Sequence, residues 1–309
     1  MIAWVYGFAG ITSDTNIEVA DIVIFLCNLT ILFIHHLYCY YGKCFNRNSW
    51  NCFFQNMAIL DEFSTDRNLT LVLLKIICML AIFFGPSCAI IFFYGFDGHG
   101  NWMNTLANAF WILAILQLFY LVVFWCETCN ILSLRYKFII NTVKGICSED
   151  IYVRQKSMKE IINIIVGVHK TVKYINEAAG FFILDMLVMS TLASLTCVNL
   201  ILLQHPDNGF FKIIWYFPYS ISFMVLSIIV IMSCDQVEKK STEFIQTCIY
   251  IQATTGDEQA ATLANLANQL RPKFSAAGFF DINQRLLPVF FSNLSTYLII
   301  ILQFKISSL

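Results

Sequence analysis

The chain has 309 residues and a formal net charge of −1 at pH 7, which excludes the strongly basic surface typical of nucleic-acid-binding proteins. Hydrophobic residues make up 58% of it and charged residues 13%, against about 25% charged in a soluble domain. With a mean hydropathy of +0.69, this composition predicts an all-α polytopic membrane protein. No phosphate-binding loop, nucleophile motif or zinc-protease motif occurs, so we expect no enzyme, no catalytic residues and no cofactor.

The N-terminal residues 1–18 begin with an apolar stretch, 2–10, that is too short to span a bilayer and lacks the basic start of a signal peptide. Six apolar segments of roughly 20 residues follow, the length that a membrane requires of a helix. They are 19–41, 71–94, 105–126, 181–203, 213–234 and 286–304. We therefore predict six transmembrane helices, with a kink at Gly85-Pro86 in the second.

Basic residues are concentrated in three long loops, which follow the first, third and fifth predicted spans. The N-terminal segment and the loops at 95–104 and 204–212 contain almost none. By the positive-inside rule, the three basic loops are cytoplasmic and both termini are extracellular. This pattern predicts a multi-pass protein of the plasma membrane.

The basic loops keep apolar residues at helical spacing, notably over 122–144 and 158–179. They therefore predict that the spans continue into the cytoplasm as helices, with extensions at about 128–178. Residues 241–270 are also predicted helical, with a break at 253–257 and an end at Arg271-Pro272. Such basic helices can bind anionic membrane lipid.

Twelve cysteines lie mainly within or beside apolar segments, so we expect them to be reduced packing residues. Cys126 and Cys129 form a CxxC pair. No second pair or nearby histidine completes a ligand set, and no metal site is expected.

The outer halves of the first, second, third and fifth spans predict a small-molecule pocket with aromatic walls and a few polar groups. The candidate ligand-binding residues are Asn28, Phe93, Asn108, Trp111 and Tyr219. Trp and Tyr also form interfacial belts in most membrane proteins, and that alternative applies most strongly to Trp102, Trp215 and Tyr216.

The last span carries Ser292, Thr296, Ile299 and Gln303 within about 60° of one another on a helical wheel. A polar stripe on a spanning helix indicates either a pore lining or helix–helix packing through small polar residues. The wheel alone leaves both open. Tyr297 lies on another face, where we expect it to pack against a neighbouring helix.

The closing motif is Thr296-Tyr297, five apolar residues and then Gln303-Phe304. It resembles the TYxxxxxQF motif that ends the insect gustatory receptors, and the run Phe274 to Asn283 resembles the segment that leads into it. The resemblance implies a ligand-gated cation channel for a small-molecule tastant, assembled as a homo- or heterotetramer. It also implies a cytosolic anchor at 235–285 and a pore helix at 286–309. The pore and gate residues would be Thr296, Ile299, Ile300, Gln303 and Phe304.

The resembled family has seven spans, a cytoplasmic N-terminus and an extracellular C-terminus. The six spans here align with its last six, so the chain resembles a receptor without its first span, with 1–18 as an extracellular stub. A truncated gene model, a splice form and a non-functional copy stay open. A G-protein-coupled receptor is a further alternative, but no DRY-like motif follows the third span and no NPxxY occurs in the last. A secondary transporter lacks support because no repeat relates the halves.

Overall fold

A computed structural model of the chain describes residues 46–61, 102–146, 151–203, 209–256 and 258–308, together with Thr30 and Ile34. The described part is mainly helical. Its elements are α3 (Arg47–Asp61), α5 (Trp102–Ile146), α6 (Ile151–Leu203), α7 (Gly209–Thr255), α8 (Glu258–Gln269), β1 (Ser275–Ala276), β2 (Phe280–Asp281) and α9 (Leu286–Ser308). The predicted first and second spans lie outside the described residues, apart from Thr30 and Ile34.

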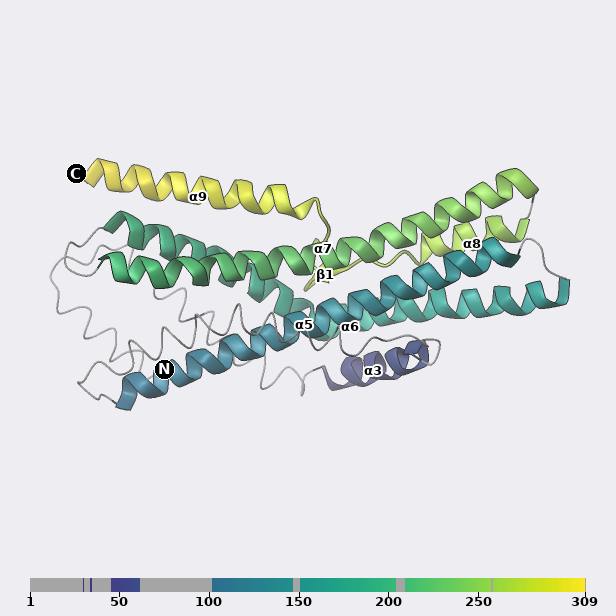
Figure 1. Cartoon of the computed structure of the whole chain (residues 1–309), viewed down its shortest axis with the longest axis horizontal. Helices are drawn as coiled ribbons and strands as arrows, with labels where there is room; N and C mark the ends of the chain where they lie inside the picture. Colours follow the sequence, from purple (N-terminus) through teal and green to yellow (C-terminus); the bar gives the residue numbers. More distant parts are fainter. Residues whose placement is uncertain are drawn as a thin grey trace.

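The helices α5, α6 and α7 each extend along most of the molecule, with α7 packed against both others and α5 diverging from them toward its start (Figure 1). They have 45, 53 and 47 residues. At about 1.5 Å per residue, each is roughly twice as long as a bilayer core is thick. All three are long and apolar enough to cross a membrane. The third, fourth and fifth predicted spans are therefore helical, and so are their predicted extensions.

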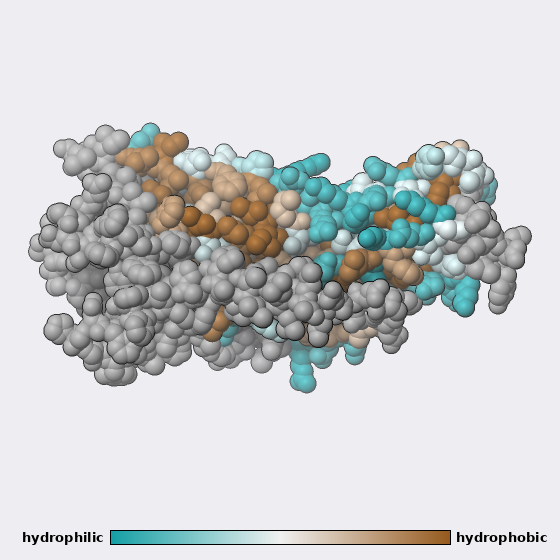
Figure 2. Space-filling model, viewed as in Figure 1, coloured by the Kyte–Doolittle hydropathy of each residue, from teal (hydrophilic) through white to brown (hydrophobic). Residues whose placement is uncertain are grey.

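The described surface changes character along these helices. In Figure 2 it is mainly apolar over one half of the molecule and mainly polar over the half that carries α8. We call these the apolar half and the polar half. A helix that leaves the bilayer keeps its backbone hydrogen bonds while its outward side chains become polar, which accounts for one continuous helix with two surfaces.

The core continues from the apolar half into the polar half where α7 packs between α5 and α6. Trp125 and Tyr136 of α5 and Phe244 of α7 are almost fully buried there. The Trp125 indole N–H donates to the Cys234 sulfur at 3.0 Å, which satisfies its polar group inside the core. Burying side chains of this size contributes roughly 1.5–3 kcal/mol each. The three helices are thus held together well beyond the apolar half.

Helix α3 lies inside the loop between the first two predicted spans, where no helix was expected. It presents Trp50, Phe53, Met57 and Leu60 to the rest of the molecule, at spacings of three and four residues, and it packs against α6. This spacing is the signal that sequence reasoning missed. Polar residues on the other faces of α3 lower the mean hydropathy of the segment. A search for long apolar segments that could span a membrane therefore does not detect it.

The chain reverses after α7 and forms two further structures before α9. Gly256 adopts a φ of +69° between α7 and α8, inside the break predicted at 253–257. Helix α8 ends at Gln269, next to the predicted stop at Arg271-Pro272. Residues 275–281 then form a small antiparallel hairpin, with Ser275 opposite Asp281. We call 270–285 the linker and 275–281 the hairpin.

Candidate pore helix and its attachment

Helix α9 covers the predicted closing span and is 23 residues long, about 35 Å, which is sufficient to cross a bilayer core. Its start is fixed by Asn283. The side-chain oxygen of Asn283 accepts from the Arg285 N–H at 3.0 Å, and its carbonyl accepts from the Leu286 N–H at 2.9 Å. Pro288 falls in the first turn, where a missing backbone N–H costs no helical hydrogen bond.

Helix α9 lies along the edge of the bundle and contacts α6 and α7 mainly near its own start (Figure 1). Leu286, Leu287 and Phe290 are partly buried against the core. Farther along, Leu294 is buried, whereas Tyr297 and Ile299 are each 53% exposed. An apolar helix with such exposure needs lipid or another protein chain around it. Within one chain, α9 is therefore held mainly near its start, and most of its described side chains after Leu294 are exposed.

Two hydroxyl groups of α9, of which Thr296 lies on the polar stripe, have their hydrogen bonds already made. The Thr296 hydroxyl donates to the Ser292 carbonyl at 3.0 Å, and the Ser295 hydroxyl donates to the Phe291 carbonyl at 2.8 Å. These hydroxyls can face lipid at little cost because the helix backbone accepts from them. The side chain of Gln303 is exposed, and an amide with two donors is not satisfied in this way. The argument for water along the stripe therefore rests less on Thr296 than on Gln303.

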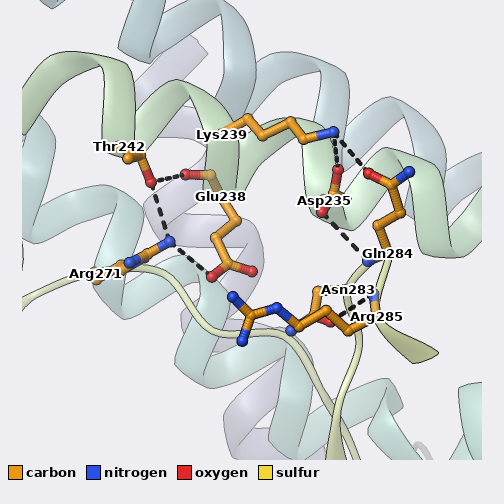
Figure 3. A network of polar contacts seen from close by, with 8 residues as sticks. All are labelled: Asp235, Glu238, Lys239, Thr242, Arg271, Asn283, Gln284 and Arg285. Atoms are coloured by element: carbon orange, nitrogen blue, oxygen red, sulfur yellow. Dashed lines mark hydrogen bonds and ion pairs between the residues drawn. The ribbon is translucent and has the colours of Figure 1, made fainter.

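Two polar clamps join the linker to α7 (Figure 3). In the first, the Arg271 Nη2 group donates to the Glu238 carboxylate at 2.8 Å and to the Thr242 hydroxyl at 3.0 Å. In the second, Asp235 Oδ1 accepts from the Gln284 backbone N–H at 3.2 Å. Lys239 completes this clamp, since its ammonium lies 2.7 Å from Asp235 Oδ2 and donates to the Gln284 side chain at 2.9 Å. Both ends of the linker are thus fixed to one face of α7.

The linker also runs along α6. Asn176 donates from its amide to the Lys273 carbonyl at 2.7 Å and accepts from the Ser275 N–H at 3.1 Å. Farther along α6, Gly180 lies against the hairpin so closely that an added Cβ would stand 2.9 Å from Ala277 N and 3.0 Å from the Ser275 carbonyl oxygen. The linker therefore depends on an amide and a glycine about 100 residues earlier in the chain.

The linker makes a tight turn within the hairpin. Ala277 has a φ of +52° and Gly278 a φ of +81°, both in the left-handed region that favours glycine. The turn is closed by the Gly278 N–H, which donates to the Ser275 hydroxyl at 2.9 Å, and by the Phe279 N–H, which donates to the Ala276 carbonyl at 3.0 Å. This segment is accordingly a defined structure that sets where α9 begins.

The sequence matches the family described as 7tm chemosensory receptor over residues 3–308. The chain belongs to this family. No curated protein matches it by sequence.

The fold of this chemosensory receptor is similar to that of the insect olfactory receptor OR5 from Machilis hrabei. The TM-score is 0.61 at 14% sequence identity, and the match covers 98% of this chain and 88% of that chain. The same receptor in complex with eugenol gives a TM-score of 0.62 at 13% identity over the same shares. The assignment to the insect chemoreceptor superfamily and to an all-α, multi-pass membrane fold is thereby confirmed.

The candidate pore residues of this chemosensory receptor lie together on α9. Thr296, Ile299, Ile300 and Gln303 all have exposed side chains, and Phe304 occupies the next helical position after Gln303. Tyr297 is exposed as well, so the packing expected of its ring is not made within one chain.

The candidate ligand-binding residues are less fully described. Asn108 and Trp111 lie in α5 and Tyr219 lies in α7. Asn28 and Phe93 lie outside the described residues. The pocket therefore stays a prediction, whereas the closing helix and its attachment are described in detail.

Proposed function

We propose that this receptor is a ligand-gated, non-selective cation channel of the gustatory type, in which α9 lines the pore. The observation that carries the proposal is a mostly apolar helix, exposed along most of its length, with the Gln303 amide near its end. An exposed amide on such a helix is costly in lipid but is suited to an aqueous lumen.

Assembly supplies the lumen in this proposal. Four copies, identical or mixed, would place their α9 helices around one axis, with the polar stripe inward and the opposite face on lipid or on the bundle. Gln303 then offers a side-chain oxygen to a passing cation. Ile299 and Ile300 lie about one turn away and would form a constriction that closes by excluding water. Phe304, next to Gln303, would seal the same level of the lumen.

The ligand in this proposal is a small-molecule tastant bound in the outer, apolar half. The similar olfactory receptor was solved with eugenol, which supports a small molecule as the ligand class. The closing motif at 296–304 supports the gustatory type. Residues 19–234 would form the ligand-binding bundle, 235–285 the cytosolic anchor and 286–309 the pore helix, with the C-terminus outside the plasma membrane.

The test is cysteine accessibility during current recording. Single cysteines are placed at 299, 300, 303 and 304, with Leu298→Cys as a matched control about 130° away from the stripe. We expect a water-soluble thiol reagent to change the current at one or more of the four positions and to leave the control unchanged. The unsubstituted receptor controls for the twelve native cysteines. If all four positions are unreactive with and without ligand, α9 does not line a pore.

Recording in cells with G-protein signalling blocked separates this proposal from a G-protein-coupled receptor. A direct ligand-evoked current that persists supports a channel. A response that disappears with G-protein signalling contradicts it.

A further inference from the structure

The hairpin lies where three predicted spans leave the bilayer. The fourth span begins at 181, one residue after Gly180, and the Gly180 position lies against Ala277 and Ser275. The fifth span ends at 234, one residue before Asp235, and Asp235 accepts from the Gln284 N–H. The last span begins with Leu286, directly after the linker. Contacts on α6, α7 and α9 therefore place 275–285 at one edge of the membrane.

Phe279 projects from the tip of this hairpin and is 75% exposed, the highest value among the large apolar side chains that the structure describes. It does not hang from a loose loop. The turn that presents it is closed by hydrogen bonds at Gly278 and Phe279, and the hairpin is fixed to α6 through Asn176. A rigidly presented phenylalanine at the edge of a bilayer has apolar acyl chains within reach.

Three exposed basic side chains lie on α6 and on the linker. The linker follows the α6 stripe that contains His169, Asn176 and Gly180, and Lys173 lies on that same stripe. Lys273 lies on the linker and Arg285 at its end. All three basic side chains are exposed, and no described carboxylate forms an ion pair with them.

The acidic residues nearby are few. Glu177 of α6 accepts from the Ser49 hydroxyl at 2.9 Å, and Asp281 lies on β2. Lys239 and Asp235 neutralise each other. Glu127 of α5 also lies at this level, since the Trp125 ring packs 5.9 Å from the Phe274 ring, so the case for a phosphate rests on the exposed basic side chains and not on a net charge.

We propose that the hairpin is a binding site for an anionic phospholipid of the inner leaflet. Phe279 inserts between acyl chains, while Lys173 and Lys273 bind the headgroup phosphate, with Arg285 alongside. The assignment to the inner leaflet rests on the orientation in the proposed function, in which the polar half is cytoplasmic. That leaflet is the one rich in anionic lipid.

A second copy of the chain is the competing occupant, and the charges argue against it. A protein surface that covered the lysines would have to supply carboxylates opposite them. At this level of the described chain, Glu177 already accepts from Ser49, and Asp235 and Glu238 are paired with Lys239 and Arg271, which leaves Glu127 and Asp281 among the carboxylates. A phospholipid supplies a phosphate and acyl chains in one molecule.

The first experiment measures how deeply the side chain at position 279 enters the bilayer. Phe279→Trp is prepared in the full chain and reconstituted into nanodiscs of phosphatidylcholine with brominated acyl chains. The emission of the unsubstituted receptor, which has 6 tryptophans, is subtracted. We expect the added indole to emit at short wavelength and to be quenched by the bromines. Emission typical of water without quenching overturns the proposal.

The second experiment measures how much the two lysines contribute to phospholipid binding. Lys173→Gln with Lys273→Gln is compared with the control pair Lys156→Gln and Lys159→Gln. The control pair makes the same charge change on exposed α6 positions roughly 20–25 Å farther from the bilayer. Bound phosphatidylserine is quantified by mass spectrometry as its fraction in the nanodisc is raised. We expect the first pair to weaken binding by roughly fivefold per lysine and the control pair to change it little, because its charges lie beyond the screening length.

Equal phosphatidylserine binding by the unsubstituted receptor and both variant pairs overturns the headgroup site. If Phe279→Ala dissociates the oligomer and the indole is not quenched, the tip contacts a second copy instead. Neither experiment depends on current. If the indole is quenched but the receptor never conducts, the lipid site stands and the proposed channel function is wrong. If the receptor conducts but the indole is not quenched, only the lipid site is wrong.

Discussion

Gly180→Ala tests whether the close contact between α6 and the hairpin is required. A Cβ there would stand 2.9 Å from Ala277 N and 3.0 Å from the Ser275 oxygen, both backbone atoms, whereas ordinary contacts lie at 3.4–4 Å. The hairpin would have to move by about half an ångström, and overpacking of this kind costs roughly 1–3 kcal/mol. Alanine favours a helix over glycine by about 1 kcal/mol, so we expect a net destabilisation of up to about 2 kcal/mol.

Two other helical glycines provide matched controls. At Gly145 an added Cβ meets nothing within 4 Å, and at Gly167 it meets the flexible end of Leu60 at 3.3 Å. We expect Gly145→Ala to be neutral or slightly stabilising and Gly167→Ala to be intermediate. The assay is the apparent melting temperature of the purified receptor in detergent. The variants at 145 and 180 should differ by on the order of 5 °C. If Gly180→Ala has the same melting temperature as Gly145→Ala and gives normal ligand-evoked currents, the contact between Gly180 and the hairpin does not constrain the linker.

Three further predictions concern the pore, the pocket and the clamps. Gln303→Ala should shift the reversal potential in mixed cation solutions, and Phe304→Ala should raise the current without ligand. If neither the reversal potential nor the current without ligand changes, the closing motif does not take part in ion permeation. Trp111→Ala should lower the ligand response while surface expression and tetramer formation persist, and loss of all three together would show that Trp111 is a packing residue. Arg271→Gln should lower stability by about 1 kcal/mol, because the Arg271–Glu238 pair is about one-third exposed. Lys240→Gln, which breaks an exposed pair within α7, should cost less, and equal melting temperatures would argue against the clamp.

The long helices were predictable because their information is local. Four predicted spans lie within α5, α6, α7 and α9, and the extensions of the first three follow from apolar residues at helical spacing. The break at 253–257 was predictable for the same reason, since Gly256 takes a left-handed conformation there. Periodicity and breakers are properties of a short window, so one sequence is enough to read them.

The attachment of α9 was not predictable because its partners are far apart in sequence. Asn176 and Lys273 are separated by 97 residues, and Gly180 constrains Ala277 through a contact that no window contains. The hydroxyls on α9 show a different limit. The wheel places Thr296 on the stripe, but it does not reveal that its hydroxyl donates to the Ser292 carbonyl. Whether the hydrogen-bonding groups of a side chain are satisfied depends on its rotamer, which the spacing of residues in a sequence does not specify.

The position of the attachment decides where along α9 a gate is effective in the proposed channel. The clamps at Asp235 and Glu238 and the contact at Gly180 all lie near the start of α9, so a shift of α6 or α7 is passed to that end. A helix of 23 residues is about 35 Å long, and a tilt of about 5° about its start moves its far end by roughly 3 Å. That displacement is about the diameter of a water molecule, whereas near Leu286 the same tilt moves the backbone very little. Residues that open and close a lumen are therefore most effective near the C-terminal end of α9, where Gln303 and Phe304 lie.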